Sequence, residues 1–280
     1  MSNIGDSGSC SGEKAYRECE ALGVLSNERQ ADGIWLLRLA APGMAGKVEP
    51  GQFAHFRLPR FGGHILRRPF SIYDANAEEG TIELLYQLAG KGTEHMTSLV
   101  PGEQLDCIGP VGIGWAPPEG TRNALLVCGG VGIAAVNMLA LALRRNGAAV
   151  TCAFGAGNAG KLAGIERLEG AGAKMLIATD DGSAGYHGFV TDLMRDALAT
   201  DPSIDYIAIC GPKPMEAIAC RIALGSERVA SGDVRCEVSM ENRMACGIGA
   251  CLSCVVDTVD GLRRACADGP VFDARKVVWR

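Results

Sequence analysis

Four cysteines near the C-terminus have the residue type and the spacing for redox chemistry. Cys246, Cys251, Cys254 and Cys266 stand in the order C-x4-C-x2-C-x11-C, and the spacing of the first three is that of a plant-type 2Fe-2S cluster. Each iron of such a cluster takes two thiolates, so these four cysteines would complete one cluster, with Cys266 supplied by a later strand. Structural zinc and inert buried thiols are the alternatives that the spacing leaves open.

The loop between the first two of these cysteines is rich in glycine. Gly247 and Gly249 can turn backbone N–H groups toward sulfur, which favours the cluster. The other eight of the 12 cysteines stand singly, mostly in apolar or turn contexts, and are predicted to be free thiols. The sequence therefore favours single-electron transfer.

Composition limits the compartment and the partners. The net charge of -5 and the pI near 5.5 give no electrostatic reason to expect nucleic acid. Residues 1–14 are polar without an apolar core, so we expect no signal peptide and a reducing, cytoplasmic location. The longest apolar stretch, residues 131–143, falls short of the roughly 20 residues that a membrane span needs, so no membrane is expected.

The 280 residues divide into three blocks after a predicted flexible tail at 1–15. Residues 16–118 hold short apolar runs separated by Pro-Gly breaks, which predicts an antiparallel β-barrel. In residues 119–233, strands alternate with helical stretches, beginning with a strand at 124–128 and a helix at 133–145, which predicts a doubly wound parallel sheet. Residues 234–280 are too few for an independent core, so a cluster would help to hold them together.

Two motifs in the barrel block could bind an anionic dinucleotide. Arg68 offers a fork of donors for a pyrophosphate, Pro69 fixes an extended backbone, and Ser71 offers a hydroxyl. In residues 90–96, glycines precede Thr93, which is predicted to be the N-cap of a short helix that could accept phosphate. A solvated strand edge and an ordinary capped helix are the alternatives, but the two motifs together favour a flavin.

Two turns in the α/β block could meet a second nucleotide. Gly129, Gly130 and Gly132 follow a buried strand and open a helix, although they lack the third glycine of G-x-G-x-x-G. Residues 210–212 form another turn at a strand's carboxyl edge, where open α/β sheets bind ligands. A tight connection without a ligand is the alternative for either turn.

The sequence offers no catalytic acid or base. His55, His64, His95 and His187 have no partner at a metal-ligand spacing, so each is interpreted as solvated or locally hydrogen-bonded. The segment 180–183, Asp-Asp-Gly-Ser, is typical of a turn.

From about Tyr16 onward the chain resembles the electron-transfer subunit of B-type (class 1B) dihydroorotate dehydrogenase, a branch of the ferredoxin-NADP reductase superfamily. The most specific stretch is residues 240–256, which carry the first three cysteines, followed by Cys266 and the segment Asp268-Gly269-Pro270-Val271-Phe272. The resemblance implies a barrel that binds FAD, a nucleotide domain that binds NAD(H), and a 2Fe-2S domain. Residues 109–115 are similar to the family's link between the first two.

The same resemblance implies the site residues. The FAD site would comprise Arg68, Pro69, Phe70, Ser71, Leu85, Tyr86, Gln87, Gly92 and Thr93. The nicotinamide side would comprise Gly129, Gly130, Gly132, Cys210, Gly211 and Pro212. The segment 154–158 lacks an arginine for a 2′-phosphate, which favours NAD over NADP.

The implied mechanism is a relay to which this chain contributes no general base. A separate FMN-containing catalytic subunit, in a 2:2 heterotetramer, would oxidise dihydroorotate, a step of pyrimidine biosynthesis. Its electrons would pass through the 2Fe-2S cluster to FAD and then, as a hydride, to NAD+. One alternative is the small subunit of an NADH-dependent ferredoxin:NADP oxidoreductase or sulfide dehydrogenase, where we would expect one aspartate ligand. A redox sensor whose flavin does not turn over is the non-enzyme alternative.

Overall fold

The computed structural model describes residues 18–63 and 65–279. The predicted tail at 1–15 and His64 lie outside the described residues. Two seven-stranded sheets and a two-stranded hairpin make up the described sheet structure. No helix of the described chain is long and apolar enough to cross a membrane.

The first sheet is antiparallel throughout and curls around its own core, in the order β4-β3-β7-β1-β2-β6-β5. Alternation along the strands brings apolar side chains such as Leu37, Leu39, Ile82 and Leu84 inside, fully buried. The predicted antiparallel barrel is confirmed. Its strands are β1 (Glu18–Ala31), β2 (Ile34–Ala40), β3 (Phe53–Arg57), β4 (Arg68–Ser71), β5 (Asp74–Asn76), β6 (Thr81–Gln87) and β7 (Gln104–Val111), with η1 (Ala45–Lys47) and α1 (Lys91–Met96) between them.

The second sheet has the order β11-β10-β9-β8-β12-β13-β16, parallel except at β16. Both of its faces are covered by helices, which agrees with its almost continuously apolar strands and confirms the doubly wound prediction. The strands are β8 (Asn123–Gly129), β9 (Ala149–Ala156), β10 (Lys174–Thr179), β11 (Tyr186–His187), β12 (Tyr206–Cys210), β13 (Arg235–Ser239) and β16 (Val271–Asp273). The helices are η2 (Gly130–Gly132), α2 (Ile133–Arg145), η3 (Ala159–Lys161), α3 (Ile165–Gly170), α4 (Val190–Thr200), α5 (Lys213–Leu224) and α6 (Glu227–Ser231).

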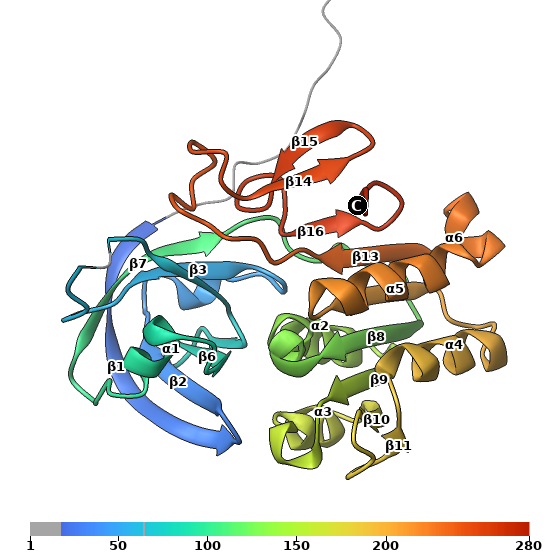
Figure 1. Cartoon of the computed structure of the whole chain (residues 1–280), viewed down its shortest axis with the longest axis horizontal. Helices are drawn as coiled ribbons and strands as arrows, with labels where there is room; N and C mark the ends of the chain where they lie inside the picture. The colour runs from blue at the N-terminus through green and yellow to red at the C-terminus, as the bar shows by residue number, and fades with distance from the viewer. Residues whose placement is uncertain (1–17, 64, 280) are drawn as a thin grey trace, which may run out of the picture.

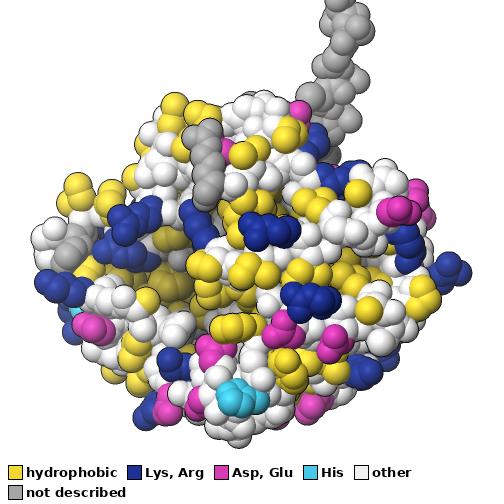
Figure 2. Space-filling model, turned by 45° about the vertical axis from the view of Figure 1, so that its right-hand side comes forward, with side chains coloured by type: hydrophobic (Ala, Val, Ile, Leu, Met, Phe, Trp, Pro, Cys, Tyr) yellow, Lys and Arg dark blue, Asp and Glu magenta, His cyan; other side chains and the backbone are white. Residues whose placement is uncertain are grey.

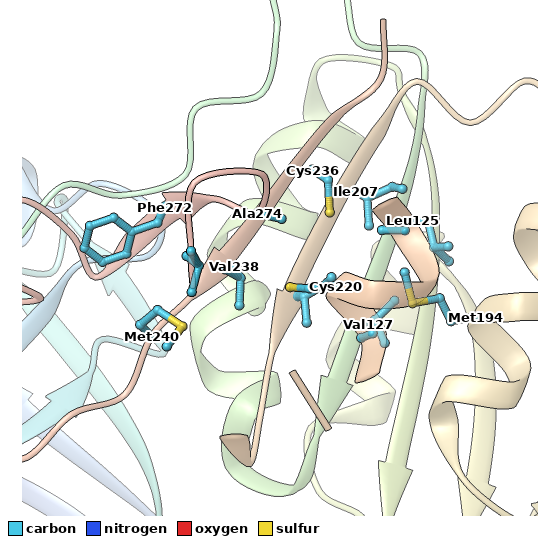
Figure 3. Packing of buried hydrophobic residues seen from close by; sticks show 14 of the residues in the cluster. Leu125, Val127, Met194, Ile207, Cys220, Cys236, Val238, Met240, Phe272 and Ala274 are labelled. Atoms are coloured by element: carbon cyan, nitrogen blue, oxygen red, sulfur yellow. The ribbon is translucent and has the colours of Figure 1, made fainter. Parts of the chain in front are cut away.

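The C-terminal segment is built onto this second sheet. Two of the sheet's strands, β13 and β16, come from residues 234–280, and between them lies the hairpin of β14 (Val255–Thr258) and β15 (Gly261–Arg264). Figure 1 shows this segment, in red, above the junction of the two larger domains. Its side chains share one core with the nucleotide domain: Figure 3 shows Met240 and Phe272 beside Val238 and the buried Cys220.

The link after β7 is held by close backbone contacts. A Cβ at Gly114 would lie 2.1 Å from the Pro50 carbonyl oxygen, so only glycine fits there. The indole Nε1 of Trp115 donates a 2.8 Å hydrogen bond to the carbonyl of Ala135 in α2. This link therefore fixes the first turn of α2 against the barrel.

Candidate functional site

The four cysteines come together in one loop region. Positive φ angles at Gly247 (70°) and Gly249 (82°) wind the loop so that its backbone N–H groups face sulfur. The Gly249 N–H donates to Cys266 Sγ over 3.1 Å and the Ile248 N–H to Cys246 Sγ over 3.5 Å. Cys266 lies in the turn after β15, so its expected position on a strand was wrong.

The four thiols influence one another in two pairs, since the Cys251 thiol shifts the pKa of Cys246 and the Cys254 thiol shifts that of Cys266. Burial alone would raise the pKa of Cys246, but the surrounding N–H groups and the Cys251 thiol outweigh it and lower that pKa to about 6. Burial and the Cys254 thiol raise the pKa of Cys266 to about 12. Two thiol pairs plus N–H donors fit a cluster of two irons.

No three potential ligands within the described ranges converge as a single metal ion would require. The loop is open on one side: Cys251 is exposed, whereas Cys254 and Cys266 are buried. Beside Cys251, Ile248 and Leu252 are 49% and 63% exposed. A cluster held here would have one side in the protein core and another at an apolar surface.

A cavity of about 710 Å³ lies where the barrel meets the C-terminal segment. Figure 2 shows a hollow on this molecule with hydrophobic side chains on its floor and basic side chains at its edge. Predicted flavin residues that line the cavity are Arg68, Pro69, Phe70, Ser71, Leu85, Tyr86, Gln87 and Thr93. Gly92 is not in the lining, but a Cβ there would lie 3.0 Å from Arg68 Nε, so it allows Arg68 to lie against α1.

Two details of this wall differ from expectation. Thr93 is the third residue of α1 and not its N-cap; its hydroxyl accepts hydrogen bonds from the N–H groups of Ala89 and Gly90. The Tyr86 hydroxyl is turned into the barrel, where it donates to Asn27 Oδ1 over 3.0 Å. Leu85, on the opposite face of the same strand, packs toward the nucleotide domain.

The two predicted nicotinamide turns lie against each other. A Cβ at Gly132 would lie 2.4 Å from the Cys210 carbonyl oxygen, and one at Gly211 would lie 3.0 Å from the Gly129 nitrogen. Both turns follow the carboxyl ends of neighbouring strands, β8 and β12, at the point where the strand order reverses. Gln87 Oε1 lies 3.9 Å from a Cβ position at Gly130, so these turns border the barrel's side of the cavity.

The sequence interpretation did not assign the segment from β13 to the first cysteine to the cavity. This segment supplies one wall of the cavity through Ser239, Met240, Glu241, Asn242, Arg243 and Met244. The available signal was its place directly before Cys246 and its charged Glu241 and Arg243. It joins the cavity to the cysteine loop without an intervening element.

Two buried ionisable groups were also missed. Glu216 on α5 is fully buried; its Oε1 accepts a 3.1 Å hydrogen bond from the Gly211 N–H, and burial raises its pKa to about 8. His55 on β3 is fully buried, and burial lowers its pKa to about 4, so it is not solvated as the first of the two interpretations had it. His95 is locally bonded, through Nε2 to the Pro59 carbonyl, and His187 is exposed, as expected.

Two family profiles match this chain. The profile for the iron-sulfur cluster binding domain of dihydroorotate dehydrogenase B matches residues 241–278, and the oxidoreductase FAD-binding domain profile matches residues 24–114. The first range contains the cysteine loop, and the second contains the Arg68–Ser71 strand.

Relatives match over nearly the whole chain. The protein named dihydroorotate dehydrogenase B (NAD(+)), electron transfer subunit, is 34% identical in Desulforamulus reducens, over 91% of this chain and 97% of that protein. The protein of the same name in Geobacillus thermodenitrificans is 36% identical, over 92% and 98%.

Solved structures share the fold. A chain of the NADH-dependent reduced ferredoxin-NADP oxidoreductase, reported for flavin-based electron bifurcation, has a TM-score of 0.82 and 29% identity, covering 92% of this chain and 90% of that one. Phthalate dioxygenase reductase has a TM-score of 0.63 at 16% identity, covering 86% and 87%, and supports the fold alone.

Proposed function

Since the chain belongs to the family of dihydroorotate dehydrogenase B electron transfer subunits, we propose that its cysteine loop, its cavity and its two glycine turns form one electron path. The chain is an oxidoreductase subunit whose cofactors are FAD and a 2Fe-2S cluster, and whose electron acceptor is NAD+. It works with a catalytic partner subunit. The observation that carries the path is that residues 239–244 line the cavity and continue directly into the cysteine loop.

Within this proposal, Cys246, Cys251, Cys254 and Cys266 hold the cluster. The Gly249 and Ile248 N–H groups donate to the cysteine sulfurs and would thereby raise the reduction potential of a cluster held there. Bound FAD would supply the conversion between two-electron nicotinamide chemistry and one-electron cluster chemistry.

The FAD site comprises the cavity residues Arg68, Pro69, Phe70, Ser71, Leu85, Tyr86, Gln87 and Thr93, with Gly92 behind Arg68. Arg68 supplies the positive charge for the pyrophosphate, and the strand backbone at Leu85 to Gln87 forms the wall toward the nucleotide domain. The nicotinamide of NAD(H) would bind over the edge that the two packed turns form together, where Gly129, Gly130 and Gly132 meet Cys210, Gly211 and Pro212 beside the cavity.

The partner is proposed to be the FMN-containing catalytic subunit, in a 2:2 complex. Exposed Ile248 and Leu252 beside the exposed Cys251 support docking at the cluster loop, because an apolar rim at an electron exit favours a protein partner. We place the complex in the cytoplasm.

The test is orotate-dependent NADH oxidation by the complex that co-purifies with this chain from its own host. Activity with an FMN protein in the complex is the expected result. NADH oxidation that ignores orotate but responds to ferredoxin or polysulfide would instead support the ferredoxin:NADP oxidoreductase or sulfide dehydrogenase alternative.

Cys251→Ser separates the cluster from the flavin. We expect loss of the cluster's visible absorbance and paramagnetic signal with FAD retained, because Cys251 lies on the exposed side of the loop and away from the cavity lining. Cys107→Ser in the barrel core is the control and should keep both groups. Loss of FAD from Cys251→Ser with an intact cluster would contradict the assignment of the two sites.

A further inference from the structure

His55 lies where the flavin-binding sheet meets the cluster loop. It is at the centre of β3 and pairs with Pro69 on β4 and with Ile108 on β7. Its neighbours Ala54 and Phe56 point into the barrel core, so His55 and Phe53 face outward. Phe53 belongs to the core that includes Cys254 and Cys266. The outer face of β3 is therefore the surface on which the cluster segment rests.

The imidazole touches the cluster loop directly. Nδ1 of His55 lies 2.4 Å from the position that a Cβ would take at Gly247, so only glycine leaves room for the ring. Gly247 also has a positive φ of 70°, which favours glycine for a second reason. The backbones of Arg67 and Cys246 both approach the ring closely enough to influence the pKa of the imidazole. One belongs to the residue before Arg68 and the other to a cluster ligand.

The ring is costly at this place. His55 is fully buried; its ring nitrogens lie near the backbones of Arg67 and Cys246, but neither makes a hydrogen bond of normal geometry there. A buried polar group without a good hydrogen bond destabilises the folded state, and leucine or phenylalanine would avoid this destabilisation. Barrel packing alone therefore does not explain an imidazole here, and such a group calls for a role beyond stability.

We propose that His55 is a positioning residue through which the flavin-binding domain holds the cluster loop, with a ring nitrogen bonding to the loop backbone at Cys246–Gly247. His55 pairs directly with Pro69, a residue of the Arg68–Ser71 strand, and its ring contacts Gly247, which follows Cys246. It therefore sets the spacing and orientation of the cluster relative to the flavin cavity. This inference rests on the function proposed above.

The test compares His55→Phe, which keeps a ring of similar shape without nitrogen, with His55→Gln, which keeps a donor. Each complete chain, loaded with FAD and cluster, is mixed anaerobically with NADH, and flavin bleaching and cluster reduction are followed separately, together with the cluster's paramagnetic signal. In His55→Phe we expect flavin reduction to stay within about twofold, cluster reduction to slow by about tenfold or more, and the signal to change shape. His55→Gln should recover most of the rate.

Leu22→Ala, in the barrel core on β1, is the control for loss of stability alone. It should lower the melting temperature and leave cluster reduction unchanged. Wild-type cluster kinetics and signal in His55→Phe would overturn the proposal, and so would equal slowing in Leu22→Ala. Loss of the cluster from His55→Phe alone, with FAD kept, would support it. A wild-type chain that holds neither FAD nor a cluster would instead refute the proposed function.

Discussion

The Arg68 guanidinium lies at the cavity wall with its Nε packed toward α1 and its Nη1 donating to the Leu66 carbonyl. Arg68→Ala should raise the FAD dissociation constant by about 10- to 100-fold, because a charge-assisted hydrogen bond contributes roughly 1.5–3 kcal/mol. Flavin content after gel filtration and titration of the apoprotein measure this. Arg29→Ala, at an exposed site on β1, is the control. Unchanged flavin affinity in Arg68→Ala would show that Arg68 is not part of the FAD site.

Glu216 makes stability depend on pH. Its folded pKa of about 8 lies above the ordinary glutamate value of 4.5, so between these pH values the folded state binds more protons than the unfolded state. The contribution of Glu216 to the free energy of unfolding is fully present below pH 4.5. It is lost as the pH rises to about 8, and the loss is on the order of a few kcal/mol.

Glu216→Gln keeps the acceptor for the Gly211 N–H and removes this titration. The melting temperature of the variant relative to wild type should therefore rise between about pH 5 and pH 8, with Glu227→Gln, exposed on α6, as the control. A difference that does not change with pH would show that Glu216 is ionised in the folded chain.

At this scale, spacing singled out the candidate ligands, but burial could not be foreseen. The four cysteines stand close in sequence at a diagnostic spacing, so local chemistry was enough to predict a cluster there. His55 and Glu216 are single ionisable residues in ordinary local patterns. Their burial arises from strands and loops far away in sequence: Gly247 meets His55 only after the C-terminal segment folds back on β3.

The two glycine turns after β8 and β12 pack against each other and are proposed to form the nicotinamide side as a pair. Gly132→Ala would place a Cβ 2.4 Å from the Cys210 carbonyl oxygen and push the turns apart. We expect at least about a tenfold loss in the rate of flavin reduction by NADH with FAD retained, since a displacement of about 1 Å at such a site is costly. Stopped-flow bleaching measures it, and Gly170→Ala, which meets nothing within 4 Å, is the control. An unchanged rate would show that this turn does not take part in the reaction with NADH.

Elements with a strong local period were predictable, and those defined by distant pairing were less so. The helix at 133–145 was predicted with its observed bounds, because apolar residues recur along it after a glycine turn. The start of α1 was misplaced because a threonine at the third helical position, accepting N–H groups behind it, resembles an N-cap in sequence. The pairing of β16 with β13 reaches across the whole cysteine loop and the hairpin, and it leaves no local signal.

The two larger domains are held together by contacts on the face opposite the cysteine loop. Arg167 of α3 reaches across to the barrel, where it pairs with Asp74 at 2.9 Å and Glu83 at 2.7 Å and lies 4.6 Å from the Tyr73 ring centroid. The amide of Asn137 in α2 donates to the Tyr73 carbonyl over 2.8 Å. With the Trp115 bond on the linker, these contacts determine how far the glycine turns stand from the flavin cavity.

Arg167→Met tests whether this interdomain contact matters for hydride transfer. The ion pairs are only partly exposed, and removing the cation leaves Glu83, whose side chain is 17% exposed, without its partner. We therefore expect a loss of about 1–3 kcal/mol in stability and a several-fold slower reduction of the flavin by NADH at unchanged FAD content. Arg195→Met, which removes an exposed ion pair on α4, should change neither the stability nor the rate of flavin reduction. Because Arg167 touches neither the cavity nor the cysteine loop, slower flavin reduction would have to come from a changed domain arrangement, whereas a loss of stability without any slowing would limit Arg167 to holding the fold.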